Sequence, residues 1–259
     1  MFNKKNLIVL GTIICLMAVT LIGCASSDAD YVEEGNLTVV GSGGYPPFNF
    51  FEGDEVVGFD VDTGQAIADR IGVELNYVTS DWDGLIEGLR AGYYDGILGS
   101  MAITDERLER VDFTVPYYYS GAQLVVTKES GITDPSEMDG KTIAVTVGTT
   151  FQEDAEELGA EVVPYQDDNQ TLTELLNGRV DGVITDRLVA IRAMNEMSRG
   201  DELTLAGDLL RLEKMAIAVQ KGNDELLQKL NDALEEMHED GTLTKISANW
   251  HEGADITRK

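Results

Sequence analysis

Short apolar runs recur along most of the chain and are separated by polar or glycine-containing stretches. Several are rich in β-branched residues and are bounded by turn-forming residues, which is typical of strands buried in a sheet. The predicted strands are Leu37–Val40, Leu75–Val78, Ile97–Leu98, Leu124–Val126, Ile143–Val147, Val162–Pro164, Val183–Ile184 and Ala216–Val219.

The segments between these runs repeat apolar residues with a helical period. The repeat is clearest after Asn223, where one apolar stripe continues until Gly241, a residue type suited to ending a helix. Shorter helical repeats surround Ile67, Leu89 and Ala155. Strands that alternate with helices of this length favour an α/β fold with mainly parallel sheets.

Two parts of the chain repeat one order of elements. In residues 85–98 and again in residues 172–184, a helical segment ends at glycine, turns through Asp-Gly and enters a short apolar strand. Chance recurrence of Asp-Gly turns is one explanation, and two similar α/β lobes are the other. A ligand of an open α/β sheet lies beyond the carboxyl ends of its strands. The strand ends that we expect to form one site are residues 41–45, 99–107, 148–151 and 185–187.

The first residues carry a different pattern. Lys4 and Lys5 precede an apolar run over residues 7–22, which ends at Gly23-Cys24. A charged start, a short apolar middle and small residues at the end are typical of a secretory signal. An uncleaved anchor helix is the alternative, although such a helix usually needs about 20 apolar residues.

The end of this signal resembles the bacterial lipobox. In that motif, here Leu21-Ile22-Gly23-Cys24, cleavage before the cysteine accompanies attachment of lipid to its sulfur. We therefore expect residues 1–23 to be a lipoprotein signal peptide and Cys24 to be lipidated. The acidic residues 24–35 would form a flexible tether, so that the folded part works outside the cytoplasm.

Composition narrows the function classes. The 259 residues include 47 Asp and Glu against 19 Lys and Arg, giving a formal net charge of −28. So acidic a surface repels phosphate backbones and anionic lipid head groups, which argues against nucleic-acid binding. The length suffices for one large domain or two lobes. With two cysteines, two histidines and no metal-ligand spacing, we expect neither a metal nor a cofactor.

Arg107 is the first candidate for ligand binding. It follows a predicted strand end and opens a helix that Thr104 is placed to cap. A guanidinium can grip a ligand carboxylate through two hydrogen bonds. Ser100 and the backbone N–H groups around Ala102 would add donors from the same loop. An exposed surface arginine beside two acidic residues is the alternative interpretation.

Asp186, Thr149 and Thr150 also follow predicted strands and precede helices. Asp186 is placed either to cap a helix or to pair with a ligand ammonium from the lobe opposite Arg107. The two threonines lie where free N–H groups at a helix start favour an anion, and simple capping is again the alternative. From the sequence, helix capping and ligand binding both remain possible roles for these residues.

Tyr45 and Trp82 are aromatic residues in polar loops next to predicted strands. Either could be a core residue, but together at a cleft they could enclose the aliphatic part of a small ligand or a cation. Motifs for catalysis are missing from the sequence: the glycines at 41–44 lack the Lys of a phosphate loop, and no Gly-x-Ser-x-Gly elbow occurs. We name no catalytic residue.

Residues 58–62 (GFDVD), followed by TGQAIADRIG, resemble the signature of family 3 extracellular solute-binding proteins. Members of this family deliver polar amino acids to ATP-driven importers. The match covers roughly residues 36–250, and its further motifs occur in the family's order. These are Tyr45-Pro46-Pro47-Phe48, Ser80-Asp81-Trp82-Asp83, Ile103-Thr104-Asp105-Glu106-Arg107, Val111-Asp112-Phe113-Thr114-x-Pro116-Tyr117-Tyr118, Gly148-Thr149-Thr150 and Asp181-Gly182-x-x-Thr185-Asp186.

The resemblance implies a periplasmic-binding-protein-like type II fold. In that α/β fold, two lobes are joined by two crossing hinge strands and close on the ligand. The crossings should lie near residues 121–126 and 215–220. Lobe 1 would then comprise residues 36–121 and 219–259, and lobe 2 residues 122–218.

The resemblance also implies roles for single residues. Arg107, with Ser100 and Ala102, is similar to the clamp for the ligand α-carboxylate, with help from Thr150. Asp186 matches the residue that takes the α-ammonium, and Tyr45 and Trp82 match the aromatic walls. Two positions depart from the family pattern. Ala102 replaces a common Ser or Thr, and Ser42 replaces the Asp of many relatives that bind lysine, arginine or glutamine, which weakens the case for a cationic ligand.

The sequence therefore predicts a lipid-anchored, extracytoplasmic carrier of a polar L-amino acid that is not an enzyme. Its expected partners are the amino acid and an ABC transporter permease, with the membrane reached only through the lipid anchor and the protein itself a monomer. Two alternatives remain on the same fold. One is an enzyme similar to cyclohexadienyl dehydratase, and the other is an extracellular amino-acid sensor module.

Overall fold

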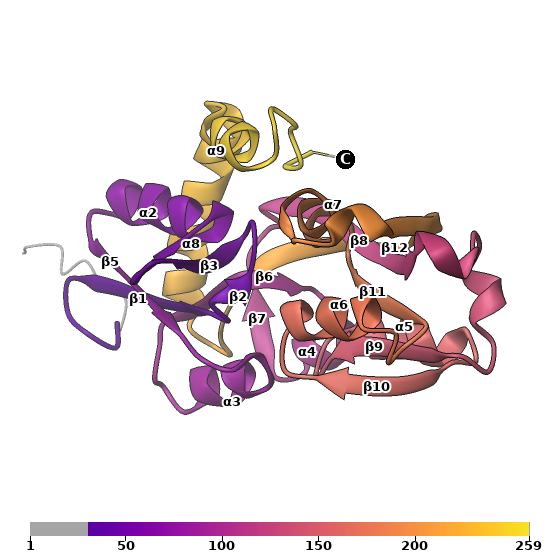
Figure 1. Cartoon of the computed structure of the whole chain (residues 1–259). Coiled ribbons are helices and arrows are strands. Elements are labelled where there is room, and N and C mark those ends of the chain that lie inside the picture. Colours follow the sequence, from indigo (N-terminus) through magenta and orange to yellow (C-terminus); the bar gives the residue numbers. More distant parts are fainter. Residues whose placement is uncertain (1–30, 259) are drawn as a thin grey trace, which may run out of the picture.

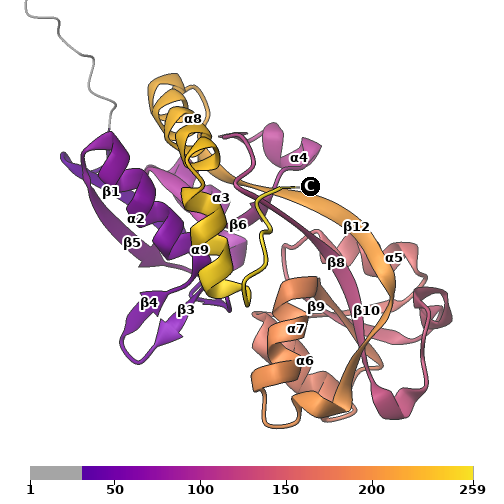
Figure 2. The same ribbon diagram turned by 90° about the horizontal axis from the view of Figure 1, so that it is seen from above.

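One mixed sheet runs through both halves of the molecule. The computed structural model describes residues 31–258, and within them the nine-stranded sheet has the order β10-β9-β11-β8-β12-β6-β1-β5, with β7 paired to β12 (Figure 1). Seen from above, two α/β lobes are joined by the two long strands β8 and β12 (Figure 2). The expected two-lobed α/β architecture is confirmed.

The first lobe is built around three parallel strands. In it β1 (Asn36–Gly41) lies between β5 (Glu74–Thr79) and β6 (Gly96–Ala102). Helix α2 (Phe59–Ile71) ends at Gly72, whose φ of 77° lies in the left-handed region that glycine adopts without strain. Its other main elements are η1 (Trp82–Gly84), α3 (Leu85–Arg90), α4 (Asp105–Leu108), β7 (Val111–Phe113), α8 (Asp224–Glu239) and α9 (Thr242–Trp250).

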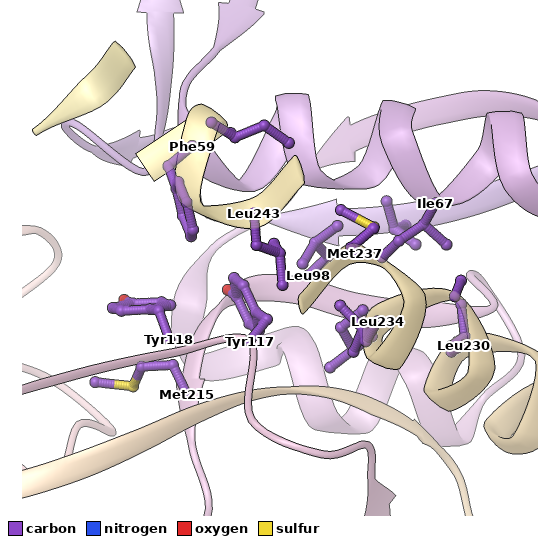
Figure 3. Close-up of a cluster of buried hydrophobic side chains, with 14 of the residues drawn as sticks. Phe59, Ile67, Leu98, Tyr117, Tyr118, Met215, Leu230, Leu234, Met237 and Leu243 are labelled. Atoms are coloured by element: carbon purple, nitrogen blue, oxygen red, sulfur yellow. The ribbon is translucent and has the colours of Figure 1, made fainter. Parts of the chain in front are cut away.

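The core of this lobe gathers distant parts of the chain. The apolar stripe of α8 packs against α2 and the sheet, and residues such as Leu230 and Leu234 are fully buried (Figure 3). Burying side chains of this kind contributes about 1.5–3 kcal/mol each. Helices α8 and α9 follow all elements of the second lobe in the sequence. The first lobe is therefore built from two separate segments of the chain.

The second lobe repeats the arrangement of the first. Its strand β9 (Thr142–Thr146) lies between β10 (Glu161–Tyr165) and β11 (Gly182–Asp186), all parallel. Helix α3 precedes β6 just as α6 precedes β11, in agreement with the repeat seen in the sequence. Its other elements are η2 (Lys128–Ser130), η3 (Pro135–Met138), α5 (Phe151–Glu157), α6 (Asp168–Leu176), α7 (Arg187–Glu196) and η4 (Gly200–Glu202).

The crossing strands β8 (Tyr118–Thr127) and β12 (Leu203–Gln220) make the sheet mixed rather than mainly parallel. They pair antiparallel with each other, and their pairing is irregular between Ala206 and Arg211. Residues 215–219 of β12 already pair with β6 of the first lobe, while residues 122–125 of β8 pair with β11 of the second. These pairings lie at the two crossings that the resemblance placed near residues 121–126 and 215–220.

A small second sheet, absent from the strands predicted above, borders the cleft. It consists of β2 (Gly44–Tyr45), β3 (Asn49–Glu52) and β4 (Glu55–Val57). These strands are short and partly exposed, so their sequences lack a continuous apolar run. Across residues 31–258, none of the helices is long and apolar enough to cross a membrane. The predicted signal peptide and Cys24 lie outside the described residues.

Candidate functional site: a cleft between the lobes

A small hollow lies between the two lobes. Both lobes and the crossing strand β12 contribute to its wall. Three of the four strand ends expected to converge line it, whereas residues 185–187 of the fourth are not among its lining residues. The lining residues are Ser42, Gly44, Tyr45, Trp82, Ser100, Ala102, Arg107, Thr146, Thr149, Thr150, Phe151, Gln166, Asp167, Asp168, Glu213 and Met215.

Arg107 is a buried residue of this wall and not an exposed surface arginine. Only 8% of it is accessible, and Thr104 caps helix α4 by accepting from the Arg107 backbone N–H at 3.2 Å. The guanidinium turns back toward the sheet, where its Nη1 donates to the Ala102 carbonyl oxygen at 2.9 Å. Burial lowers the pKa of Arg107, and the charge of Glu213 opposes this effect. The side chain remains a cation because an arginine pKa lies far above neutrality.

Ser100 is held in place by a buried hydrogen-bond network whose other members, Tyr117 and Asp60, were not predicted to be near the site. Its φ of 60° is unusual for a residue other than glycine. Its N–H donates to the Tyr117 hydroxyl at 3.0 Å, and its Oγ donates to Asp60 Oδ2 at 2.9 Å. Tyr117 also donates to Asp60, at 2.6 Å. With both donors engaged, Ser100 can offer a ligand only acceptor lone pairs, which suits an ammonium better than the expected carboxylate.

Thr149 and Thr150 line the cleft, and their hydroxyls are already engaged. Thr149 Oγ1 donates to the Thr146 carbonyl oxygen at 2.6 Å. Thr150 Oγ1 donates to Glu213 Oε1 at 2.7 Å, across to strand β12. The hydroxyl of Thr150 therefore binds a protein carboxylate here, and any donor to a ligand carboxylate would have to be its backbone N–H.

Tyr45 and Trp82 are both half-buried on the cleft wall, as expected of aromatic walls. The Tyr45 ring stacks on Phe48 with centroids 5.4 Å apart. Burial raises the pKa of Tyr45, and the charges of Asp186, Asp168 and Glu213 raise it further. Trp82 faces the Arg107 guanidinium at 5.6 Å from its ring centre, a cation–π distance.

Asp186 performs the capping role and keeps one oxygen unused. Its Oδ1 accepts from the Leu188 backbone N–H at 2.7 Å at the start of α7. The side chain is fully buried, and within residues 31–258 its Oδ2 has no hydrogen-bond partner. Burial raises the pKa of Asp186 to about 7, while the nearby Ser120 hydroxyl and the Leu188 N–H lower it. An unsatisfied buried oxygen costs free energy unless a donor reaches it.

Ser42 and Ala102, the two positions that depart from the family pattern, both form hydrogen bonds with other residues of the first lobe. Ser42 Oγ donates to Asn49 Oδ1 at 3.2 Å and accepts from the Gly44 N–H at 3.3 Å. Ala102 is buried, and its carbonyl oxygen receives the Arg107 hydrogen bond. Position 42 therefore brings a hydroxyl to the wall and no charge.

The two lobes touch at the Gly148 carbonyl oxygen. Trp82 Nε1 donates to it at 3.1 Å and Arg107 Nη2 at 3.3 Å, both from the first lobe. Gly148 has a φ of 74°, a conformation for which glycine is the natural residue. These contacts place the cleft in a closed arrangement, with the aromatic and cationic walls held against the second lobe.

Glu213, Asp167 and Asp168 line the cleft and were not among the predicted residues. Glu213 lies in a run of alternating charges, Arg211-Leu212-Glu213-Lys214, which looks like an exposed strand. Asp167 caps α6, so its sequence context is that of an ordinary cap. Among residues 31–258 no cluster of His, Cys, Asp and Glu could hold a metal ion.

Two α/β lobes on crossing strands, closed over a small hollow, define the class of two-lobed proteins that enclose a small solute. Residues 37–253 match the family described as bacterial extracellular solute-binding proteins, family 3, and the chain belongs to this family. The resemblance drawn from the sequence is thereby confirmed.

Individual relatives agree with this assignment. The chain is similar to the L-cystine-binding protein TcyJ of Escherichia coli strain K12, with 36% identity over 87% of this chain and 86% of the relative. It is 33% identical to ABC transporter arginine-binding protein 1 of the same strain, over 91% and 98% of the two chains. These relatives are binding proteins and not enzymes.

A solved structure supports the type II fold. An ancestral arginine-binding protein bound to glutamine superposes with a TM-score of 0.80 and 36% identity, covering 86% of this chain and 100% of the other. The expected periplasmic-binding-protein-like type II fold is confirmed by this match.

Proposed function

We propose that this protein binds a polar L-amino acid outside the cytoplasm and hands it to an ABC importer, and that its cleft closes on the ligand. The relatives named for cystine and arginine support the ligand class, and the ABC transporter in one of their names supports the partner. The permease would recognise the closed form of a monomeric carrier. Membrane attachment would come from lipid on Cys24.

One observation carries the proposal. Arg107 is a cation on the cleft wall, and Asp186 is a fully buried carboxyl, close enough to raise the pKa of Tyr45 on that wall, with one oxygen unpaired in the described structure. The α-carboxylate of an amino acid fits the first group and its α-ammonium fits the second, with the Ser100 lone pairs as a further acceptor. Because Arg107 and Asp186 belong to different lobes, the ligand would stabilise the closed arrangement through contacts that an open cleft lacks.

Calorimetry on two variants tests the clamp. Removing one partner of a buried, hydrogen-bonded charge pair costs about 3–5 kcal/mol, or roughly two to three and a half decades in affinity. We therefore expect Arg107→Ala and Asp186→Ala to lose nearly all binding of the amino acid that stabilises the wild-type protein most in a thermal-shift screen.

Matched controls keep the test specific. Arg90→Ala removes an exposed arginine of the first lobe, and Asp181→Asn alters a carboxylate of the second lobe that bonds Thr142 outside the cleft. Both should bind with wild-type affinity. Near-native affinity in either clamp variant, with melting curves that show a folded protein, contradicts the proposal.

A further inference from the structure

The charges on the cleft wall do not balance. Of the lining residues, Arg107 is the cation, whereas Asp167, Asp168 and Glu213 carry carboxyl groups. Asp186, close enough to raise the pKa of Tyr45 on that wall, adds a fourth. A zwitterionic amino acid brings one charge of each sign, so its α-groups can satisfy Arg107 and Asp186 and still leave a surplus of carboxylates.

Glu213 is the carboxylate best placed to meet a ligand. Its side chain is only 5% exposed, yet it lines the hollow. Both of its contacts end on Oε1, which lies 2.7 Å from Thr150 Oγ1 and 3.1 Å from Arg211 Nη2. Oε2 accepts no hydrogen bond from the described residues and is not one of the buried atoms that lack a partner, so on the wall of the hollow it can accept a hydrogen bond from a ligand.

Arg211 neutralises Glu213 only in part. The same nitrogen, Nη2, also contacts Asp154 Oδ2 at 2.8 Å, so one guanidinium serves two carboxylates. A third of the Arg211 side chain is exposed, which weakens its charge through solvent screening. Burial raises the pKa of Asp154 to about 6 even with Arg211 beside it.

Asp167 and Asp168, the carboxyl groups that the second lobe contributes to the wall, have no cation among their contacts in the described structure. Asp168 is buried and accepts from Thr146 Oγ1 at 3.0 Å and from the Thr185 hydroxyl. Asp167 accepts from the backbone N–H and the side-chain amide of Gln170, each at 2.9 Å. Hydroxyl and amide donors satisfy hydrogen bonds but leave the negative charge in place.

The carboxylates of the wall weaken the argument from Ser42 against a cationic ligand. The loss of an Asp at this position counts against a cationic ligand as long as the first lobe alone is considered. In the closed cleft, the crossing strand and the second lobe supply the negative charge instead, at Glu213, Asp167 and Asp168. The half-buried faces of Tyr45 and Trp82 are further surfaces on which a cation can lie.

We propose that the bound amino acid has a side chain ending in a positively charged nitrogen, as in arginine or lysine, and that Glu213 Oε2 accepts a hydrogen bond from it. This inference rests on the function proposed above. A ligand with a second carboxylate, such as cystine, is disfavoured because Arg107 is the lone cation on the described wall and is taken by the α-carboxylate.

Pairs of ligands with equal shape and different charge test the inference. L-arginine is compared with neutral L-citrulline, and L-lysine with neutral L-2-aminoheptanoic acid, in which a methyl group replaces the ammonium, by titration calorimetry on the wild-type protein. A charge-assisted hydrogen bond in a buried site corresponds to about tenfold or more in affinity. We expect the charged member of at least one pair to bind about tenfold more tightly than its neutral partner, and more tightly than cystine.

Variants of Glu213 assign the preference to this residue. Glu213→Gln keeps the shape and should remove most of the preference for arginine over citrulline. Glu213→Asp keeps the charge and should retain the preference even where the absolute affinity falls. Glu174→Gln is the matched control, because Glu174 is a mostly buried carboxylate of the second lobe that pairs with Arg179 away from the cleft. Melting temperatures verify that each variant is folded.

The outcomes separate this inference from the proposed function. Tight binding of a neutral amino acid or cystine that is lost in Arg107→Ala would leave the amino-acid carrier intact and overturn the cationic ligand. An unchanged preference in folded Glu213→Gln would overturn the role of Glu213. If none of the twenty L-amino acids or cystine binds the wild-type protein, the proposed function itself fails, and the inference with it.

Discussion

Burial controls the charge of the cleft carboxyls. The pKa of Asp186 is raised to about 7 and that of Asp168 to about 6, because each loses hydration without gaining a cation. The ionised form of Asp186 is the one that an ammonium stabilises. In the free protein at neutral pH, Asp186 is therefore shared between its protonated and ionised forms, and binding of a ligand ammonium as proposed here would displace the proton.

This coupling predicts the pH dependence of binding. As the pH falls below about 7, free Asp186 gains a proton that must be released on binding, so the affinity should fall by up to about tenfold per pH unit. The ligand's α-ammonium stays charged over this range. Calorimetry between pH 8 and pH 5.5 measures the slope, and Asp186→Asn should give weak binding that varies much less with pH. A wild-type affinity that stays constant over this interval rules out proton displacement at Asp186.

Single residues were predictable where a local motif fixed them. Thr104, Arg107 and Asp186 stand at element boundaries, and the structure places all three there, with Thr104 and Asp186 capping helices. Glu213 was missed because a charged residue in a strand reads as solvent-facing. Its burial depends on Thr150 and Arg211, which approach it only after the two lobes have folded.

At the scale of elements, the lobes meet through polar, cation–π and apolar contacts. Trp82 bonds Gly148 of the opposite lobe, and the Arg192 guanidinium of α7 lies 4.6 Å from the ring centre of Phe50 on β3. Val189 of α7 also packs in the core cluster of the first lobe. The second lobe has two core clusters of its own, so these contacts can break without unfolding it. Rotation about β8 and β12 is therefore the motion that this architecture permits.

The two tryptophans of the chain report on this motion separately. Trp82 Nε1 bonds Gly148 of the opposite lobe, whereas Trp250 Nε1 bonds Asp62 within the first lobe at 2.7 Å. We expect Trp82→Phe to abolish the ligand-induced change in fluorescence and to weaken binding about two- to tenfold, the value of one hydrogen bond. Trp250→Phe is the control and should preserve both the fluorescence change and the affinity. A signal that disappears with Trp250 instead would contradict closure at Trp82.

Strands and helices with continuous apolar patterns were predicted well from the sequence. The stripe after Asn223 became α8, and all eight apolar runs lie on strands of the main sheet, with Val147 alone extending one residue beyond the end of β9. The small sheet β2–β4 was not predicted because its short strands have no continuous apolar run. They form through hydrogen bonds with each other. The residues at which β8 and β12 pass from one lobe to the other depend on strand pairing, because both strands form hydrogen bonds along the sheet that joins the lobes. A local sequence pattern does not contain this information.

At the scale of the whole molecule, the acidic surface and the proposed anchor suit work outside the cell. A net charge of −28 keeps copies apart and lowers attraction to anionic lipid heads, so electrostatics alone would not hold the protein at a membrane. A covalent lipid on Cys24 would do so.

Substitution of the two cysteines tests the anchor. In a bacterial host that processes lipoproteins, the wild-type protein should incorporate labelled palmitate and enter the detergent phase on phase separation. Cys24→Ala should do neither. Cys15→Ala changes a cysteine inside the predicted signal peptide and should remain lipidated. Palmitate labelling that persists in Cys24→Ala would show that the anchor is attached elsewhere or is an uncleaved helix.

The sequence by itself determined the two-lobed α/β plan, the family and half of the residues on the cleft wall, because apolar periodicity, caps and short linked motifs are local properties. The tertiary structure alone decided which charges share the cleft. Glu213, Asp167 and Asp168 come together with Arg107 through the closing of two lobes, and the field in a buried space depends on distance and dehydration, which a linear order of residues does not contain.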